Sequence, residues 1–239
     1  MVESEIAVLK RAAALRALKF VESGMRLGLG TGSTAEIFLE LLAARVQEGL
    51  RITGAATSQR TALKARTLGI PLVPLEEVAP LDLTIDGADE ADRNLDLIKG
   101  GGGALLREKI VASASTRMVV IADRSKLVPQ LGRFPLPIEV IEFGHSVTAS
   151  RIRAVTAKAG YNRLVMTLRT QDGAVFRSDS GNVIYDCAFN CISAAPDLAA
   201  LLKGIVGVVE QGLFVGLASE LVVAHSPTNV EIIHRRPHG

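Results

Sequence analysis

Short apolar segments alternate with amphipathic segments over the first half of the chain, and this order restricts the possible folds more than any other feature. Residues 26–29 predict a buried strand, and apolar side chains recur at helical spacing over residues 35–46. Further strands are predicted at residues 52–57, 71–73, 81–85 and 118–122, and further helices at residues 6–21, 58–68 and 104–114. Strands that alternate with helices form a mostly parallel sheet, whose ligand sites lie at the carboxyl ends of the strands. We therefore expect an α/β protein with a Rossmann-like sheet domain.

A second module is expected beyond residues 132–137, where glycine and proline form a link and the strand-then-loop pattern ends. Its predicted strands are residues 138–141, 164–170 and 183–188, and its predicted helices are residues 146–159 and 196–205. This β-α-β-β-α order is most of a ferredoxin-like unit. Residues 208–214 and 221–224 are predicted strands that return to the first sheet. We therefore expect a catalytic domain of residues 1–131 plus 208–239, with an inserted, smaller α+β (ferredoxin-like) domain of residues 132–207.

Composition and charge argue against several classes of protein. Of the 239 residues 48% are apolar and 22% are charged, which suits a folded core. The net charge of +2, from 27 Lys and Arg against 25 Asp and Glu, favours neither nucleic acid nor a membrane surface. Cys187 and Cys191 have no histidine spaced to complete a zinc site, so we expect reduced thiols. A cytoplasmic protein is expected, because Glu3 and Glu5 precede any apolar run, unlike a secretory signal, and no run is long enough to span a membrane.

The first candidate site segment follows the predicted strand at residues 26–29 and reads Gly-Leu-Gly-Thr-Gly-Ser-Thr over residues 28–34. Its glycines allow backbone N–H groups to approach an anion, and Ser33 and Thr34 add hydroxyl donors at the start of a helix. The spacing is neither the dinucleotide fingerprint nor the P-loop. A tight turn with a Ser/Thr helix cap explains the segment equally well, so the spacing alone leaves both interpretations open.

Two carboxylates follow the next buried strand in the segment Asp-Gly-Ala-Asp-Glu at residues 86–90. Asp86 and Asp89 at a strand end can share one ligand or divide acid and base roles. A turn stabilised by the Asp86 side chain is the simpler interpretation when this segment is taken by itself.

The third candidate segment is Lys99, followed by four glycines at residues 100–103 and by Glu108. Consecutive glycines lose much backbone entropy on folding, so a close approach of the backbone to a ligand explains them better than a plain turn does. Glu108 is placed early in a helix, where an exposed glutamate is also favourable. Lys126, near the end of another predicted strand, supplies a candidate cation, although most such lysines are only exposed to solvent. Taken together, the three segments and Lys126 suit a phosphorylated polyol.

Six sequence motifs closely resemble those of the ribose-5-phosphate isomerase A family. They lie at residues 30–34, 86–90, 99–109, 122–126, 134–140 and 180–186. The resemblance covers essentially the whole chain in the same order, with departures at residues 58–61 and in the tail at residues 234–239. It implies an aldose-ketose isomerase of the non-oxidative pentose phosphate pathway. Such an enzyme interconverts D-ribose 5-phosphate and D-ribulose 5-phosphate through an enediolate, needs no cofactor or metal, and forms a homodimer or homotetramer.

The resemblance also implies roles for individual residues. Glu108 would accept the proton, Asp86 and Asp89 would orient the sugar hydroxyls, and Lys99 would bind substrate. Lys10 would lie near the phosphate. The other implied substrate-binding residues are Thr31, Gly32, Ser33, Thr34, Gly87, Ala88, Gly100, Gly101, Gly102 and Lys126.

Three other classes fit the sequence less well. A sugar-phosphate sensor would need a helix-turn-helix before the first strand, and about 25 residues are too few for one. A relative of the acyl-CoA transferases with a glutamate nucleophile accounts for Glu108 but not for the motifs around Lys99 and the two aspartates. A dehydrogenase conflicts with the glycine spacing, and no acidic residue is evident after the second strand.

Overall fold

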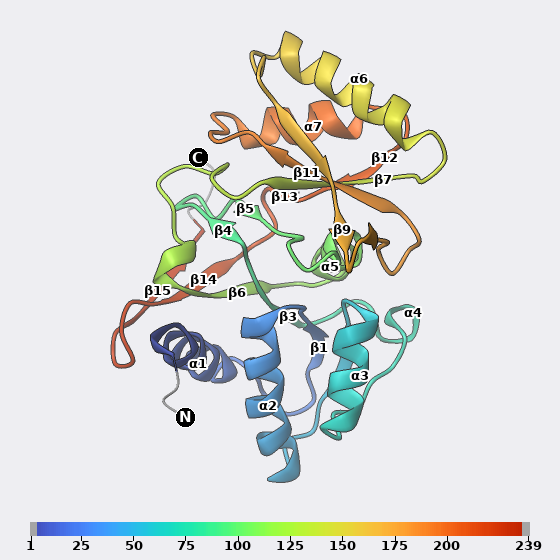
Figure 1. Cartoon of the computed structure of the whole chain (residues 1–239). Helices are drawn as coiled ribbons and strands as arrows, with labels where there is room; N and C mark the ends of the chain where they lie inside the picture. The colour runs from blue at the N-terminus through green and yellow to red at the C-terminus, as the bar shows by residue number, and fades with distance from the viewer. Residues whose placement is uncertain (1–3, 236–239) are drawn as a thin grey trace.

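A six-stranded sheet is the largest sheet in a computed structural model that describes residues 4–235 (Figure 1). Glu3 and the end of the tail, residues 236–239, lie outside the described residues. The sheet has the order β15-β14-β6-β3-β1-β2, and its neighbours are parallel except for β15, which is antiparallel to β14. The strands are β1 (Arg26–Leu29), β2 (Thr53–Ala56), β3 (Leu83–Gly87), β6 (Met118–Asp123), β14 (Glu220–Ala224) and β15 (Val230–His234). The expected α/β class with a mainly parallel sheet is confirmed.

Both faces of this sheet are covered, as the alternating side chains of β6 show. Val119 and Ile121 join a core with helices α1 (Glu5–Leu18) and α2 (Ser33–Gln47). Met118 and Val120 point to the other face, into a cluster that includes Ala112 of α5 (Leu105–Ser113). A strand that is buried on both faces is apolar throughout, which explains the continuous apolar run that predicted it. Helices α3 (Gln59–Thr67) and α4 (Leu75–Val78) flank β2.

A four-stranded antiparallel sheet lies above the first sheet in Figure 1. Its order is β12-β7-β11-β8, and it is built from β7 (Leu136–Val140), β8 (Val165–Leu168), β11 (Val183–Ala188) and β12 (Val208–Gln211). Helices α6 (His145–Lys158) and α7 (Ala195–Lys203) complete a βαββαβ order, in which β12 supplies the last strand. A two-stranded hairpin, β9 (Thr170–Gln171) and β10 (Ala174–Val175), extends from β8 toward α5 (Figure 1).

The expectation that residues 208–214 return to the first sheet is wrong. β12 pairs with the edge of β7, and β13 (Leu213–Phe214) pairs with β5 (Leu97–Ile98) in a small sheet that also contains β4 (Glu90–Ala91). The edges of β7 and β5 would otherwise leave backbone groups unpaired, and β12 and β13 pair with them before β14 joins the first sheet beside β6. The division into a domain of residues 1–131 plus 208–239 and an inserted domain of residues 132–207 stays a prediction.

Smaller differences concern short elements. Residues 71–73 form only an isolated bridge, from Gly54 to Leu72, rather than a strand. Cys187 is buried, Cys191 is exposed, and neither forms a disulfide. Over the described residues, every helix is too short or too polar to cross a membrane.

The chain order places a crevice between β1 and β3. After β1 the chain moves to β2 on one side, and after β2 it returns to β3 on the other side of β1. The loops that leave the carboxyl ends of β1 and β3 therefore diverge, and ligands of parallel sheets bind at such a point. These two loops are the glycine-rich segment at residues 30–34 and the acidic segment at residues 86–90.

Candidate active site

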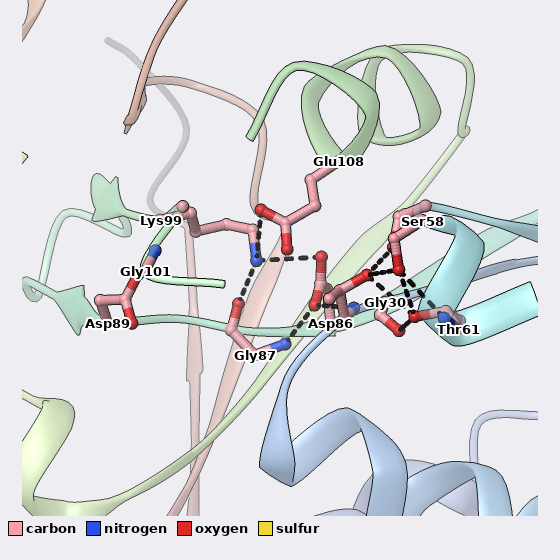
Figure 2. Close-up of polar contacts among 12 residues, drawn as sticks. Gly30, Ser58, Thr61, Asp86, Gly87, Asp89, Lys99, Gly101 and Glu108 are labelled. Atoms are coloured by element: carbon pink, nitrogen blue, oxygen red, sulfur yellow. Dashed lines mark hydrogen bonds and ion pairs between the residues drawn. The ribbon is translucent and has the colours of Figure 1, made fainter. Parts of the chain in front are cut away.

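The centre of the candidate site is a buried cluster of one lysine and two carboxylates (Figure 2). The Lys99 Nζ lies 2.9 Å from Asp86 Oδ2 and 3.5 Å from Glu108 Oε2. It also donates a hydrogen bond of 2.6 Å to the carbonyl of Gly87. The exposed fraction is 2% for Lys99, 0% for Asp86 and 4% for Glu108. Residues from β3, from the position after β5 and from α5 thus meet in a site that is largely closed to solvent.

The cluster holds two carboxylates and one ammonium group, and this imbalance of charge affects the pKa of Glu108. The pKa of Glu108 is raised to about 8: burial is the largest cause, Lys99 opposes it, and the charges of Asp86 and Asp89 add to it. Burial lowers the pKa of Lys99, but the charges of Asp86 and Glu108 outweigh it, so the net pKa is raised. One ammonium group therefore neutralises one carboxylate, and Glu108 exchanges its proton near neutral pH. That is the range in which a general base is most effective.

Asp86 lies beneath the pocket, where it is tied to the backbone. Its Oδ1 accepts hydrogen bonds from the N–H of Thr31 at 3.0 Å and the N–H of Gly87 at 2.7 Å. Burial raises the pKa of Asp86, while Lys99 and these two N–H groups oppose the change. Gly30 is required at the end of β1, because a Cβ there would lie 2.6 Å from the Asp86 Cα. Asp86 therefore lies behind Lys99 and holds the ammonium group in place.

Asp89 lies on the other side of Lys99 and binds the glycine loop, which is the loop of four glycines at residues 100–103. Its backbone N–H donates to the carbonyl of Ile98 at 2.8 Å, and its Oδ2 accepts a hydrogen bond of 2.8 Å from the N–H of Gly101 (Figure 2). The loop between β3 and β4 is thus joined to the loop that follows Lys99.

A cluster of hydroxyl groups surrounds Thr31. The Thr31 Oγ1 lies 2.7 Å from Thr57 Oγ1, 2.8 Å from Ser58 Oγ and 2.9 Å from Thr61 Oγ1. Ser58 also caps α3, since its Oγ accepts a hydrogen bond from the N–H of Thr61. In the sequence, residues 58–61 stand out only as a departure from the family pattern. Nothing in their spacing indicates contact with the glycine-rich segment at residues 30–34.

A cavity of ≈ 100 Å³ opens beside the charged cluster, and Lys99 and Glu108 line it. It brings together most of the predicted site residues, although Asp86 and Gly101 do not line it. Lys10 of α1, which the family resemblance placed near the phosphate, also lines the cavity, and its Nζ donates a hydrogen bond of 2.9 Å to Ser33 Oγ at the N-terminus of α2. The lining residues are Lys10, Thr31, Gly32, Ser33, Thr34, Gly87, Ala88, Asp89, Lys99, Gly100, Gly102, Glu108 and Lys126.

The two kinds of lining group suit two parts of one ligand. Lys10, Lys126 and the N-terminus of α2 supply positive charge and N–H donors, which bind an anion such as a phosphate. Glu108 and Asp89 provide carboxylates near Lys99, which suit proton transfer on a polar carbon chain. Among residues 4–235, no group of three or more His, Cys, Asp or Glu side chains is placed to hold a metal ion. Fold and site together define a class of α/β proteins with an acid-base site for a small anionic substrate.

Comparisons with known proteins identify the family. The sequence model of the family described as ribose 5-phosphate isomerase A (phosphoriboisomerase A) matches residues 53–227. The chain is 54% identical to ribose-5-phosphate isomerase A of Nitrobacter hamburgensis over 228 residues, 95% of this chain and 98% of the relative. The chain therefore belongs to the ribose 5-phosphate isomerase A family, as its motifs indicated.

Solved structures agree with this assignment. Ribose 5-phosphate isomerase from Plasmodium falciparum superposes with a TM-score of 0.92 at 36% identity, covering 98% of this chain and 100% of that one. A D-ribose-5-phosphate isomerase in complex with phospho-erythronic acid superposes with a TM-score of 0.89 at 35% identity, covering 97% and 100%. The fold described above is therefore the fold of this family.

Proposed function

We propose that the chain is an aldose-ketose isomerase that interconverts D-ribose 5-phosphate and D-ribulose 5-phosphate in the non-oxidative pentose phosphate pathway. Family membership supports the reaction. The observation that carries the proposal is the position of Glu108, a buried carboxylate with a raised pKa that lies 3.5 Å from Lys99 and lines the cavity.

The substrate binds in the open-chain form with its phosphate toward α2. Lys10, Ser33 and Lys126 receive the phosphate, because they lie at the cationic end of the cavity. The aldehyde and the C2 hydroxyl then reach Glu108, Lys99 and Asp89 at the opposite end. A phosphate fixed at one end supplies binding energy that orients the reacting carbons at the other.

Isomerisation needs one base and a stabilised oxyanion. The Glu108 carboxylate removes the C2 proton, the C–H electrons form a C1–C2 double bond, and the carbonyl electrons move to O1. The ammonium group of Lys99 stabilises this negative charge, while Asp86 behind it keeps Lys99 charged. A proton then passes from O2 to O1 with the help of Asp89, and Glu108 returns its proton to C1 as the ketone forms at C2.

The direct test is to incubate the purified protein with ribose 5-phosphate and a chelator and to follow ketose formation. Turnover in the chelator supports the isomerase without a metal. An inactive, folded protein under these conditions would contradict the proposal.

Replacing the base tests its role. Glu108→Gln should lower kcat by at least ~10²-fold, because an amide cannot accept the proton. The protein should stay folded, because the Gln side chain resembles the protonated carboxyl that a pKa of about 8 leaves at neutral pH. Glu40→Gln is the control, since Glu40 lies on α2 in an exposed ion pair with Lys64. Near-normal turnover in folded Glu108→Gln would refute this role.

The setting of the enzyme is also proposed. A phosphorylated pentose is the expected partner, and neither nucleic acid nor a membrane is expected from a net charge of +2. A cytoplasmic location is proposed from the sequence, and a homodimer or homotetramer from the family resemblance; sedimentation equilibrium would measure the state of assembly.

A further inference from the structure

The glycine loop at residues 100–103 needs an outside contact to keep one conformation. Gly100 has φ +104° and Gly103 has φ +81°, and the N–H of Gly103 donates to the carbonyl of Gly100 at 3.0 Å. Glycine populates several regions of φ/ψ space at similar energy, so consecutive glycines do not select this turn by themselves. The loop joins Lys99 to the helix of Glu108, and its conformation therefore affects both residues.

Arg169, between β8 and β9, supplies such a contact from the four-stranded sheet. Its Nη1 donates to the carbonyls of Gly100 at 2.9 Å and Gly101 at 3.3 Å. The guanidinium is itself held by Asp186 of β11, through hydrogen bonds of 2.9 Å from Nε and 2.5 Å from Nη2. It also lies 5.7 Å from the ring centre of Phe176. With 13% of its side chain exposed, Arg169 is an ordered donor rather than a surface cation.

The contact orients two successive peptide groups. The carbonyl of Gly100 and the N–H of Gly101 belong to one planar peptide, which Arg169 holds at the oxygen and Asp89 at the nitrogen. The carbonyl of Gly101 belongs to the next peptide, whose N–H is that of Gly102. Because carbonyl and N–H point in opposite directions in a trans peptide, Arg169 turns the N–H of Gly102 away from itself. Gly102 lines the cavity.

We propose that Arg169 is a positioning residue, which selects the loop conformation that aligns Asp89 and offers the Gly102 N–H to the reacting end of the substrate. The inference rests on the proposed isomerase function. Without the guanidinium, either glycine peptide can flip at low energetic cost. A flip would remove the partner of Asp89 or point a carbonyl, rather than an N–H, at the developing oxyanion.

The test compares Arg169→Met with Arg169→Lys and with a control on the same segment, Arg177→Met. Arg177 pairs with Glu142 in an ion pair whose side chains are both 51% exposed, so its loss should leave kcat within about twofold of the parent protein. Arg169→Met should lower kcat by at least ~10-fold, on the scale of a misplaced catalytic group. Arg169→Lys should restore part of the loss, because its ammonium group can still donate to one carbonyl.

The inhibition constant of inorganic phosphate, measured as a competitive inhibitor, distinguishes the positioning role of Arg169 from a purely structural role. The phosphate end lies on Lys10, Ser33 and Lys126, so the inhibition constant should stay unchanged in Arg169→Met while kcat falls. Circular dichroism shows whether each variant is folded at the temperature of the assay. If Arg169→Met does not fold, Asp186→Asn takes its place, because it loosens the guanidinium without removing it.

A folded Arg169→Met or Asp186→Asn variant with kcat within twofold of the parent protein would overturn the positioning role. A fall in kcat with an equal rise in the phosphate inhibition constant would also overturn it, because the whole site would then have collapsed. If the parent protein itself fails to isomerise ribose 5-phosphate, the proposed function falls instead.

Discussion

At the scale of single residues, the site depends on an excess of buried negative charge. Lys99 faces Asp86 at 2.9 Å and Glu108 at 3.5 Å, and one cation cannot neutralise both carboxylates. Asp86 has two further N–H donors, so it is the better place for the negative charge, and Glu108 is left with the raised pKa. A base that must take a proton from carbon and return it benefits from this balance.

The pH dependence of the reaction should show this pKa. Glu108 accepts a proton only when it is ionised, so kcat/KM should rise about tenfold per pH unit below a pKa of about 8 and level off above it. Initial rates from pH 6 to 9.5 measure the profile. A midpoint near the ordinary glutamate pKa of 4.5, and hence a flat profile over this range, would contradict the assignment.

At the scale of elements, the site depends on the close approach of the ends of β1 and β3. Gly30 has no side chain where Asp86 passes, and this lets the N–H of Thr31 reach the Asp86 carboxylate at 3.0 Å. Gly87 lies one residue after Asp86, and a Cβ there would make only ordinary van der Waals contacts. Position 30 therefore requires glycine, whereas position 87 has room for a larger residue such as alanine.

Alanine substitutions should separate these two glycines. A Cβ at position 30 would lie 2.6 Å from the Asp86 Cα, whereas a Cβ at position 87 meets its nearest atom at 3.9 Å. Gly30→Ala should lower the free energy of unfolding by ~1–3 kcal/mol, the usual cost of overpacking, and Gly87→Ala by less. Urea unfolding measures both. Equal free energies of unfolding for the two variants would contradict the requirement for glycine at position 30.

At the scale of the whole molecule, the site joins segments that lie far apart in the chain. α1 contributes Lys10, the first sheet contributes the loops after β1, β3 and β6, and the four-stranded sheet contributes Arg169 to the glycine loop.

Global stability should depend on the protonation of Glu108. Its pKa is raised from 4.5 to about 8, so between these values the folded state binds more protons than the unfolded chain. Proton binding by Glu108 therefore stabilises the folded state fully below the unfolded pKa of 4.5, and this stabilisation is lost as the pH rises through about 8. Relative to Glu108→Gln, which lacks this titration, the parent protein should lose stability by up to ~1.4 kcal/mol per pH unit. Urea unfolding at pH 5, 6.5 and 8 measures the difference, and a difference that stays constant with pH would contradict the raised pKa.

The sequence by itself determined the α/β class, most of the long elements and the family, and it singled out the three candidate site segments. These features are encoded locally, in apolar periodicity, glycine runs and motif strings. Only the tertiary structure decided that Asp86 lies behind Lys99, that β12 joins the four-stranded sheet, and that Arg169 holds the carbonyl of a glycine 69 positions earlier. Such contacts depend on which strand edges and loops meet after folding, and no local spacing specifies that meeting.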